Sequence, residues 1–487
     1  MYFNIKSSVL YRDYDSFGYI TDNRNFGYEY TGNNEKDIGD KIVSKSGSLF
    51  LSVLNREPQH IDIITKKLAR LFDDIDEETI KKDALEFYGN LVIDGFLACG
   101  INMEECYNND VKFQYENVKA KEFIATSNHK IKDTQDFFEE KLHGVPQLTN
   151  VHIEITSICN ERCIHCYIPH ENKTVQMSKE MFYDILEQCR EMKVLHINIS
   201  GGEPMLHPNF LDFIKKCTEY NFSVNVLSNL TFLDEKTVVE MHKNPLLGVQ
   251  TSLYSMNKDV HDSITKMAGS YEKTISGIML LKKYNIPLQI SCPIMKQNEN
   301  EYNDVVEWGK TNNINVGSDY VIIGRYDSST QNLNNRLSVC DVEKIIRKKA
   351  NDDPNYVYDI VKEADKRKSL TSEDYICSVC HSTICVAENG NVYPCAGWQG
   401  YVIGNIKDTS LVELWNTSNK IKSLRELRRK NFPKCVDCPE KEFCTMCMVR
   451  NANESPTGDY LEVNKYFCEI ARIIKNIVNE YKEKQKV

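Results

Sequence analysis

The stretch VHIEITSICNERCIHCYIP, residues 151–169, joins an alternating apolar run to three closely spaced cysteines. Alternation with β-branched residues predicts a strand at its beginning. Cys159, Cys163 and Cys166 follow this strand, so we expect them at its carboxyl end. Zinc and most iron–sulfur clusters take four protein ligands. A loop that supplies three thiolates therefore leaves one metal position for another molecule.

The pattern continues beyond this stretch. VHIEIT, LHINIS, FSVNVLS, GVQTSLY, PLQISCPI and INVGSDYVII read as strands, and amphipathic helices separate them. Strands that alternate with helices predict an α/β fold with a parallel sheet, here a partial (β/α)6 TIM-like barrel over residues 149–330. Chemistry in such folds lies at the carboxyl ends of the strands, where the three cysteines are expected.

Composition limits the class of protein. With 487 residues the chain is long enough for about three domains of 100–200 residues. It has no apolar run of about eighteen residues and no apolar signal-peptide core, which predicts a cytoplasmic protein without a membrane partner. The net charge of −10 argues against nucleic acid as a partner. Eighteen cysteines in such a chain indicate metal sites more than disulfides.

A glycine-rich segment follows the second expected strand. LHINISGGEPMLH, residues 195–207, places Gly201, Gly202 and Glu203 directly after it. Glycine permits a close backbone approach, and a carboxylate can pair with an ammonium group. Together with CxxxCxxC one βα unit earlier, this segment resembles the radical S-adenosylmethionine (SAM) superfamily over residues 150–325.

That resemblance implies a cofactor site. A [4Fe–4S] cluster on the three cysteines would leave one iron open for SAM, whose reductive cleavage gives a 5′-deoxyadenosyl radical. The Gly201–Glu203 segment would meet the methionyl amino group, and His165 would lie near the adenine. Ser228, Asn229 and Ser252 would contact the ribose and carboxylate. For His165 the alternative is a solvated loop histidine, and for the two serines and Asn229 it is a cap at a strand end. For the three cysteines the alternatives are a zinc knuckle or thiols that bind nothing in common.

Two further cysteine groups lie near the carboxyl terminus, in CSVCHSTICVAENGNVYPC (377–395) and CVDCPEKEFCTMC (435–447), followed by Cys468. They resemble the SPASM domain, which carries two auxiliary [4Fe–4S] clusters, although that family more often has three residues between the last two cysteines. Three clusters are then expected in all.

The first auxiliary cluster would take Cys380, Cys395 and Cys447, with Cys377 or Cys385 as the fourth ligand. Cys377 is favoured because Cys385 alternates with apolar residues in an expected strand, and an open iron is equally compatible. The second would take Cys435, Cys438, Cys444 and Cys468. A zinc ribbon is the rival metal site.

The other six cysteines are scattered: Cys99, Cys106, Cys189, Cys217, Cys292 and Cys340. Small apolar packing is the default for Cys189 and Cys217 in their expected helices. Cys292 ends an expected strand, and a position facing the cavity is the less favoured interpretation.

Residues 1–100 form a unit of their own. Short aromatic strands precede three amphipathic helices, an order that resembles the RiPP recognition element, a winged-helix-like domain that binds precursor leader peptides. DNA binding is disfavoured, since 12 Lys and Arg stand against 17 Asp and Glu. FGYEYTG is the candidate edge for a leader strand. We expect a linker at 101–148 with one helix, DTQDFFEEKL, a connecting segment at 331–376, the SPASM domain at 377–470 and a carboxyl-terminal helix at 471–487.

The three domains together resemble maturases that form cysteine thioethers in ribosomal peptides. The resemblance implies a precursor peptide with a leader and a Cys-containing core, and a flavodoxin- or ferredoxin-type electron donor. Whether sulfur would join Cα or Cβ/Cγ stays open, and no catalytic base is assigned. Formylglycine formation is disfavoured, because Ala396 stands where that family has an Asp base. Carbon–carbon crosslinking and epimerisation of a peptide stay open as well. A non-enzymatic iron–sulfur electron-transfer or sensor role is disfavoured by the GGE segment.

Overall fold

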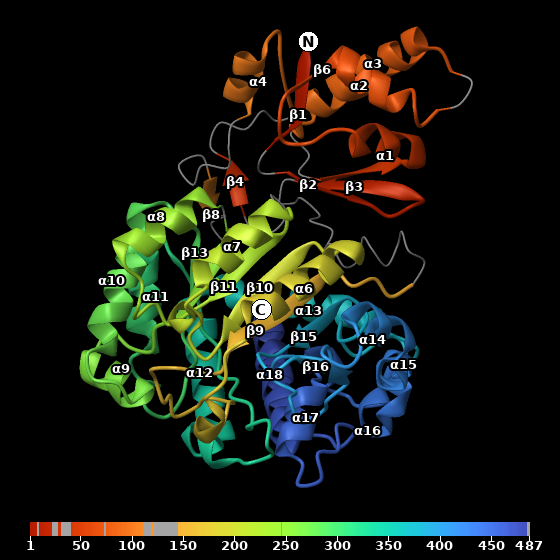
Figure 1. The fold of residues 1–487 in the computed structure, drawn as a ribbon. Helices are drawn as coiled ribbons and strands as arrows, with labels where there is room; N and C mark the ends of the chain where they lie inside the picture. Colours follow the sequence, from red (N-terminus) through yellow and green to blue (C-terminus); the bar gives the residue numbers. More distant parts are fainter. Residues whose placement is uncertain are drawn as a thin grey trace.

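The computed structural model of the chain describes residues 1–6, 9–21, 28–30, 40–72, 75–110, 118–120, 145–244 and 246–484. An amino-terminal part sits on an open barrel, and a carboxyl-terminal part packs along the barrel's side (Figure 1). The linker helix expected at DTQDFFEEKL lies outside the described residues. Within the described ranges, no helix combines the length and the apolar character needed to span a bilayer.

Six parallel strands in sequence order form the barrel sheet. They are β9 (Asn150–Thr156), β10 (His196–Gly201), β11 (Ser223–Leu227), β12 (Gly248–Ser252), β13 (Leu288–Ser291) and β14 (Asn315–Gly317). The main helices between and after them are α6 (Lys179–Glu191), α7 (Phe210–Glu219), α8 (Glu235–Lys243), α9 (Lys258–Thr265), α10 (Ser270–Lys283) and α11 (Tyr302–Thr311). The parallel α/β prediction is confirmed, with a last strand shorter than the run INVGSDYVII.

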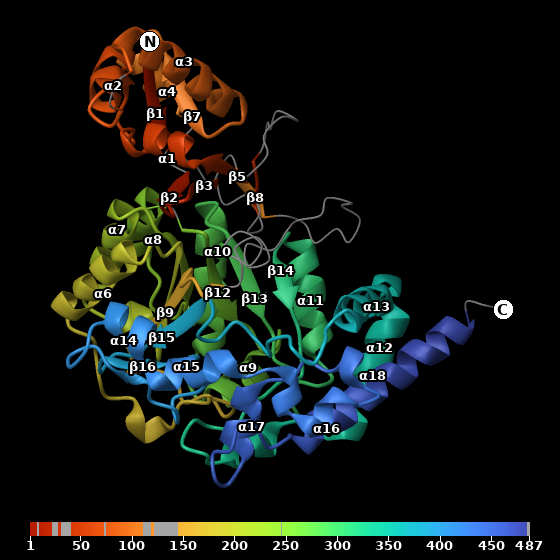
Figure 2. The same ribbon diagram turned by 90° about the vertical axis from the view of Figure 1, so that its right-hand side faces the viewer.

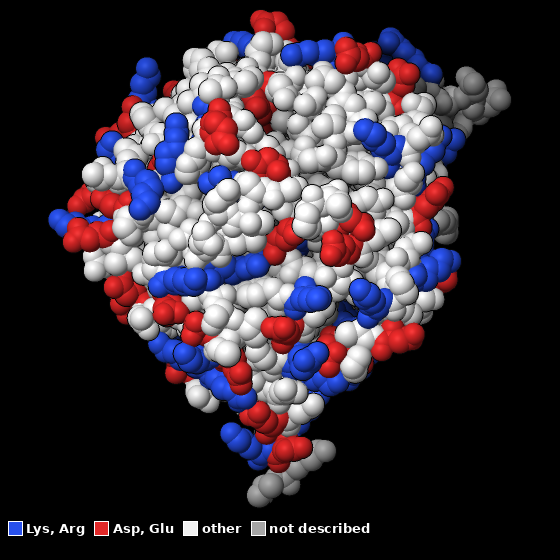
Figure 3. Space-filling view, turned by 90° about the horizontal axis from the view of Figure 1, so that it is seen from below, with Lys and Arg blue, Asp and Glu red and all other residues white. Residues whose placement is uncertain are grey.

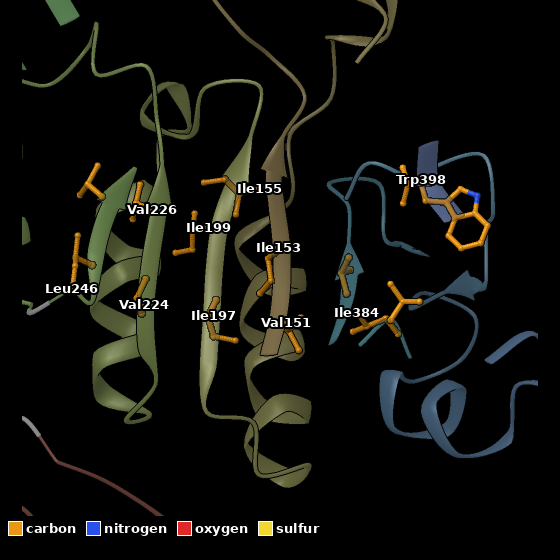
Figure 4. Close-up of a cluster of buried hydrophobic side chains, with 14 of the residues drawn as sticks. Val151, Ile153, Ile155, Ile197, Ile199, Val224, Val226, Leu246, Ile384 and Trp398 are labelled. Atoms are coloured by element: carbon orange, nitrogen blue, oxygen red, sulfur yellow. The ribbon is translucent and has the colours of Figure 1, made fainter. Parts of the chain in front are cut away.

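The alternation in β9 explains the core. Successive side chains of a strand point to opposite faces of the sheet. Val151, Ile153 and Ile155 are fully buried and share one apolar cluster with Ile197 and Ile199 of β10 (Figure 4). Burying each side chain of this size contributes about 1.5–3 kcal/mol. The side chains at the intervening positions of β9, including Glu154, point to the other face of the sheet.

The barrel sheet continues into the carboxyl-terminal part. β15 (Thr383–Val386) pairs in parallel with β9, and β16 (Asn391–Tyr393) and β17 (Gly404–Asn405) follow it in antiparallel order. Ile384 lies opposite Val151 in this register and extends the same apolar row (Figure 4). The first hairpin of the carboxyl-terminal cysteine segment therefore occupies one edge of the barrel sheet.

Helices complete the carboxyl-terminal part (Figure 2). They are α12 (Val339–Asp352), α13 (Pro354–Lys368), α14 (Leu411–Thr417), α15 (Asn419–Glu426), α16 (Pro433–Val436), α17 (Met448–Glu454) and α18 (Lys465–Lys484). The expected carboxyl-terminal helix begins at Lys465 instead of 471. Cys468 therefore lies within α18.

The amino-terminal part contains two three-stranded sheets, β6-β1-β7 and β2-β3-β5. The elements are β1 (Tyr2–Ile5), β2 (Leu10–Asp13), β3 (Phe17–Thr21), β5 (Asp40–Ser44), α1 (Lys45–Ser52), β6 (Gln59–His60), α2 (Ile61–Leu68), α3 (Glu77–Ile93), β7 (Leu97–Gly100) and α4 (Met103–Asn109). The three expected helices are confirmed. The sheet in which β1 pairs with β7 was not predicted from the sequence, because these strands lie far apart in the chain.

The candidate edge FGYEYTG is only partly described. Its strand β4 (Tyr28–Tyr30) pairs with β8 (Val118–Ala120) in a separate two-stranded sheet. The other four residues of the stretch lie outside the described residues.

The amino-terminal part rests on the amino ends of the barrel strands. The Arg12 guanidinium donates to the backbone oxygen of Val194 over 2.9 Å and to that of Asn221 over 2.7 Å. Leu195 packs into a buried cluster with Tyr14, Phe17 and Tyr19. Val194 and Asn221 lie in the turns that lead into β10 and β11. The cysteines that follow β9 lie at the other end of the sheet.

Acidic and basic side chains are interspersed on the face opposite the amino-terminal part (Figure 3). The helix α13 carries surface ion pairs between its neighbouring turns, such as Lys366 with Glu363 and Lys368 with Asp365. Exposed pairs of this kind contribute little to stability, because water and salt screen them.

Candidate active site

The three-cysteine loop leaves β9 at Thr156 and is closed by a returning segment. Thr156 forms an isolated bridge with Gln176. The Ser157 hydroxyl oxygen accepts the backbone N–H groups of Thr174 and Val175 over 3.1 and 2.9 Å. On its far side the loop is tied to the next units, since the N–H of Ile164 donates to the Ile264 oxygen over 3.0 Å. A loop with this many backbone ties holds its thiols in a defined arrangement.

Cys159, Cys163 and Cys166 are all half-buried, and the thiols of Cys159 and Cys166 lie close enough to that of Cys163 to act on its pKa. Burial raises the pKa of Cys163 well above its ordinary value, and Glu161, Cys166 and Cys159 raise it further. Across the described ranges, no three His, Cys, Asp or Glu side chains lie close enough to ligate a single metal ion. A [4Fe–4S] cube binds each thiolate to a different iron, so its ligands are spread more widely. The three thiols suit such a group.

Gly201 and Gly202 allow the second loop to lie directly on the cysteine loop. Gly201 has φ of +134°, and a Cβ there would stand 1.9 Å from the Thr156 oxygen. A Cβ on Gly202 would stand 2.3 Å from the Ile158 oxygen. The gap is instead closed by backbone hydrogen bonds from Gly202 to Thr156 at 2.7 Å and from Glu203 to Ile158 at 2.9 Å. Only glycine fits this contact between two backbones.

Glu203 links two other predicted residues, Ser228 and Asn229, through its buried carboxylate. Its Oε1 accepts the Ser228 hydroxyl over 2.7 Å, and its Oε2 accepts the Asn229 N–H over 2.7 Å. Burial raises the pKa of Glu203 to about 7, and its hydrogen bonds to Asn229, Met205 and Ser228 lower it. The carboxylate thus fastens the loop after β10 to the loop after β11. Its oxygens accept these hydrogen bonds inside the protein, and a carboxylate has further lone pairs that an ammonium ion could use.

Ser252 and His165 lie on the other side of the cysteine loop. Their common neighbour is Tyr254, whose ring makes an edge contact with His165 at 5.1 Å between centroids. Burial raises the pKa of Tyr254 well above its ordinary value, and a hydrogen bond with Ser252 partly offsets this. Burial lowers the pKa of His165 to about 4, so its imidazole is neutral at pH 7. A neutral ring next to the thiols is compatible with stacking on a cofactor base.

Two buried charged residues near the thiols were not predicted from the sequence. Glu161 is 3% exposed and accepts a hydrogen bond from the Cys163 thiol over 3.1 Å. Lys173 is 6% exposed, and its ammonium lowers the pKa of Cys159 against the dominant effect of burial. The acidic residue between the first two cysteines was a visible signal. Lys173 carries no such signal in the sequence, because only the folding of the loop brings its side chain back to the thiols.

The second cysteine group also assembles. Cys377 is exposed as a residue, although the protein around its thiol raises the pKa of that thiol to about 11, and the nearby Cys447 and Cys395 thiols contribute to this rise. Cys380 is buried and has φ of +59°. Burial raises the pKa of its thiol, Arg425 lowers it, and Cys377 raises it. Cys385 sits on β15 in an apolar cluster with Ala387 and Tyr393. Its packing favours Cys377 over Cys385 as a fourth thiol.

The third group is formed by Cys435, Cys438, Cys444 and Cys468, all half-buried. Burial raises the pKa of Cys444 to about 11, and Cys468, Cys435 and Cys438 each act on it. Cys468 reaches the group from α18, which explains why its position in the sequence is so far from the other three. Of the scattered cysteines, Cys189, Cys217 and Cys292 are fully buried in the main core.

Comparisons with known proteins agree with this geometry. Residues 153–309 match the Radical SAM superfamily, and residues 377–439 match SPASM, an iron–sulfur cluster-binding domain. The chain is 26% identical to the AdoMet-dependent heme synthase of Methanosarcina barkeri, over 64% of this chain and 94% of that protein. It is 25% identical to the subtilosin biosynthesis protein AlbA of Bacillus subtilis, over 64% of this chain and 69% of that protein.

Among solved structures, the chain is similar to Streptococcus suis SuiB bound to the precursor peptide SuiA. The TM-score is 0.60 at 15% identity, and the match covers 96% of this chain and 100% of SuiB. At this identity the likeness shows a shared fold. The two matched domains identify the chain as an enzyme that combines a radical SAM domain with a SPASM domain and uses SAM and [4Fe–4S] clusters.

Proposed function

We propose that the chain modifies a ribosomally made precursor peptide by joining a cysteine sulfur of the peptide to one of its carbon atoms. The pairing of β15 with β9 carries this proposal, because it fixes the carboxyl-terminal cysteine segment against the barrel, with Cys377 and Cys380 before β15 and the three-cysteine loop after β9. In a crosslinking reaction the carbon that loses hydrogen and the sulfur that bonds to it must be held together. A site flanked by two metal groups suits that requirement better than a site with one.

The residues have separate roles in this proposal. Cys159, Cys163 and Cys166 hold the cluster that binds SAM, and Gly201, Gly202, Glu203, Ser228, Asn229, Ser252 and His165 surround SAM itself. When bound, SAM supplies the radical that removes a hydrogen atom from the peptide. Glu203 keeps the two adjoining loops in register, and Gly202 lets them touch. The tied cysteine loop shields the reacting atoms from water.

The two other thiol groups hold auxiliary clusters in this proposal. Cys377, Cys380, Cys395 and Cys447 hold the first, and Cys435, Cys438, Cys444 and Cys468 hold the second. The thiols of each set act on one another's pKa values, as expected for neighbours at one site. A flavodoxin- or ferredoxin-type protein is the proposed electron donor.

The amino-terminal part binds the leader of the precursor in this proposal. β5 pairs with β3 on one side and has no strand partner on the other among the described residues. Lys41 of β5 forms an ion pair with Asp94 at the end of α3 over 2.5 Å, so the edge runs next to that helix. An extended leader can add to such an edge through backbone hydrogen bonds. The role of AlbA in bacteriocin biosynthesis supports a peptide substrate.

The test is an anaerobic reaction of the reconstituted full chain with a Cys-containing precursor peptide. We expect a loss of two hydrogens per crosslink, with fragmentation that locates a thioether carbon. The variant with Cys159, Cys163 and Cys166 all replaced by Ala should make no 5′-deoxyadenosine. A Cys340→Ala variant is the matched control, because Cys340 is exposed and belongs to none of the three groups. A thioether formed by the triple variant, or 5′-deoxyadenosine without any peptide product, would contradict the proposal.

A further inference from the structure

The inner face of the barrel sheet carries a row of uncharged amide side chains. In the parallel register Gln250 of β12 lies beside Gln289 of β13, and Gln289 lies beside Asn315 of β14. The other face of these strands is covered by helices, since Val249 and Ile290 are buried in the main core and α10 contacts β13. Because successive side chains of a strand alternate between faces, the three amides share the face away from the helices. We call these three residues the amide row.

The amide row is accessible and unpaired. Gln250 and Gln289 are exposed, although each lies on a strand that has a neighbouring strand on both sides. The Gln289 Nε2 extends along β14, since a Cβ on Gly317 would stand 3.7 Å from it. The three side-chain amides form no hydrogen bond with any residue that the structure describes. Side chains normally fill the interior of a small barrel, so exposed amides here show that this layer is left open.

Polar groups on β9 and β10, on the same face, bond to one another instead. The Asn198 Nδ2 donates to the Asn150 Oδ1 over 2.8 Å, and the His152 Nε2 pairs with the Ser200 hydroxyl. Both contacts join β9 to β10. The donors and acceptors over β9 and β10 are thus used within the protein, whereas those over β12, β13 and β14 are left for another molecule.

The chemistry and the spacing of the row match the backbone of an extended peptide. A side-chain amide donates and accepts hydrogen bonds as a peptide group does, and it carries no charge. Neighbouring strands lie about 4.8 Å apart, so the row spans about 10 Å. Three extended residues cover about the same length, at about 3.3–3.6 Å each. Ser252 lies on the same face two residues after Gln250, about 7 Å along β12, so a peptide on the row lies next to the residues proposed to surround SAM.

We propose that Gln250, Gln289 and Asn315 bind the backbone of the core peptide next to the residue that is modified. This inference rests on the proposed function and adds the groups that hold the core. Backbone N–H and C=O groups recur at nearly every residue, so the row holds cores of different sequence. Selection of the precursor is then left to contacts outside the row.

The test measures product formation by full-length, cluster-reconstituted enzymes at varied concentrations of a Cys-containing precursor peptide. Gln250→Leu combined with Gln289→Leu should raise the KM for the precursor about tenfold, as expected for the loss of two neutral hydrogen bonds, with kcat near the wild-type value. Gln331→Leu is the control, because Gln331 is an exposed glutamine outside the sheet. Iron content and SAM cleavage without peptide show whether each variant is assembled.

Backbone-modified precursors give the sharper result. Replacing the backbone N–H on either side of the modified residue with an ester oxygen removes donors without adding bulk. The wild-type KM should rise about tenfold for this precursor, whereas the double Leu variant should show little further rise, because its partners for these donors are already absent. Exchanging the neighbouring side chains for Ala should leave the wild-type KM unchanged.

The outcomes separate the two proposals. An unchanged KM in the double Leu variant, or an equal effect of the ester in both enzymes, would overturn the backbone-binding inference and leave thioether formation standing. A peptide product without a thioether, combined with the expected KM changes, would overturn the proposed function and support the amide row as a peptide site.

Discussion

Arg12 and Asn221 join the amino-terminal part to the barrel: the guanidinium Nη2 donates to the Asn221 backbone oxygen over 2.7 Å. The same side chain lies 5.4 Å from the centroid of the Phe222 ring. Both partners directly precede β11, at the end of the sheet away from the cysteines. The unit proposed to hold the leader and the residues proposed to hold SAM are thus separated by the length of the strands.

Replacing Arg12 with Ala should loosen this contact. The change removes the bonds to Val194 and Asn221, and hydrogen bonds to charged groups contribute about 1.5–3 kcal/mol each. We expect faster hydrogen–deuterium exchange in residues 10–21 and 193–196, with little change in β12 and β13. Arg347→Ala is the control, since its guanidinium pairs only with surface carboxylates in the described part of the chain. Equal exchange in both variants would mean that Arg12 does not hold the contact.

The separation also predicts a minimum spacer in the substrate. β9 has seven residues, which at about 3.3 Å each spans about 23 Å. An extended peptide covers about 3.3–3.6 Å per residue, so about seven residues are needed between the docked leader and the modified residue. Precursors with this spacer cut to three residues should bind normally by anisotropy yet give no crosslinked product by mass spectrometry. Full modification of the shortened peptides would show that the leader docks elsewhere.

How far the sequence predicted this protein depends on the range of the interactions. The parallel α/β sheet follows from local alternation, and the structure confirms it. Cys159, Cys163 and Cys166 follow β9, as the alternating run before them predicts. The pairing of β15 with β9 joins segments more than 200 residues apart, for which no local pattern exists. The same holds for Lys173 and for Glu154, whose neighbours Tyr167 and Gln399 come from different segments. Cys468 was placed by family resemblance, not by spacing.

Gly202→Ala should remove the SAM-site cluster while leaving the fold intact. The added Cβ would stand 2.3 Å from the Ile158 oxygen and 2.4 Å from the Ser157 oxygen, so the cysteine loop must move. Iron analysis after reconstitution should show a loss of about four irons per chain, as expected for one [4Fe–4S] cluster. Gly89→Ala in α3 is the control, because a Cβ there meets nothing within 4 Å. Retention of all iron in Gly202→Ala would contradict the close-contact argument.

Glu203 should make the stability of the apo protein depend on pH. Its pKa is raised from 4.5 to about 7 by burial, so the folded state binds a proton more tightly than the unfolded state does. That contribution is complete below about pH 4.5 and is lost as pH rises through about 7. We expect the wild-type Tm to fall between pH 5 and 8, and Glu203→Gln to show a smaller fall. A Tm slope equal to that of the wild type would show that Glu203 is ionised at lower pH.

Arg425 should set the reduction potential of the first auxiliary cluster. Its Nε donates to the Cys380 oxygen over 2.6 Å, its guanidinium packs 4.2 Å from the Trp415 ring centroid, and its buried Nη2 has no hydrogen-bond partner among the described residues. A cation in this position stabilises the reduced cluster, which carries more negative charge. Arg425→Gln should therefore lower the midpoint potential in an EPR-monitored titration, and Arg425→Lys should lower it less.

Lys420→Gln removes one positive charge from the same helix at an exposed position and is the matched control. The potential in that variant should stay close to the wild-type value, because water screens the charge. A fall of equal size in both variants would assign the effect to net charge instead of to the buried guanidinium. An unchanged potential in Arg425→Gln would show that the Nη2 group of Arg425 does not act on the cluster. The reduction potential would then not depend on the Arg425 charge.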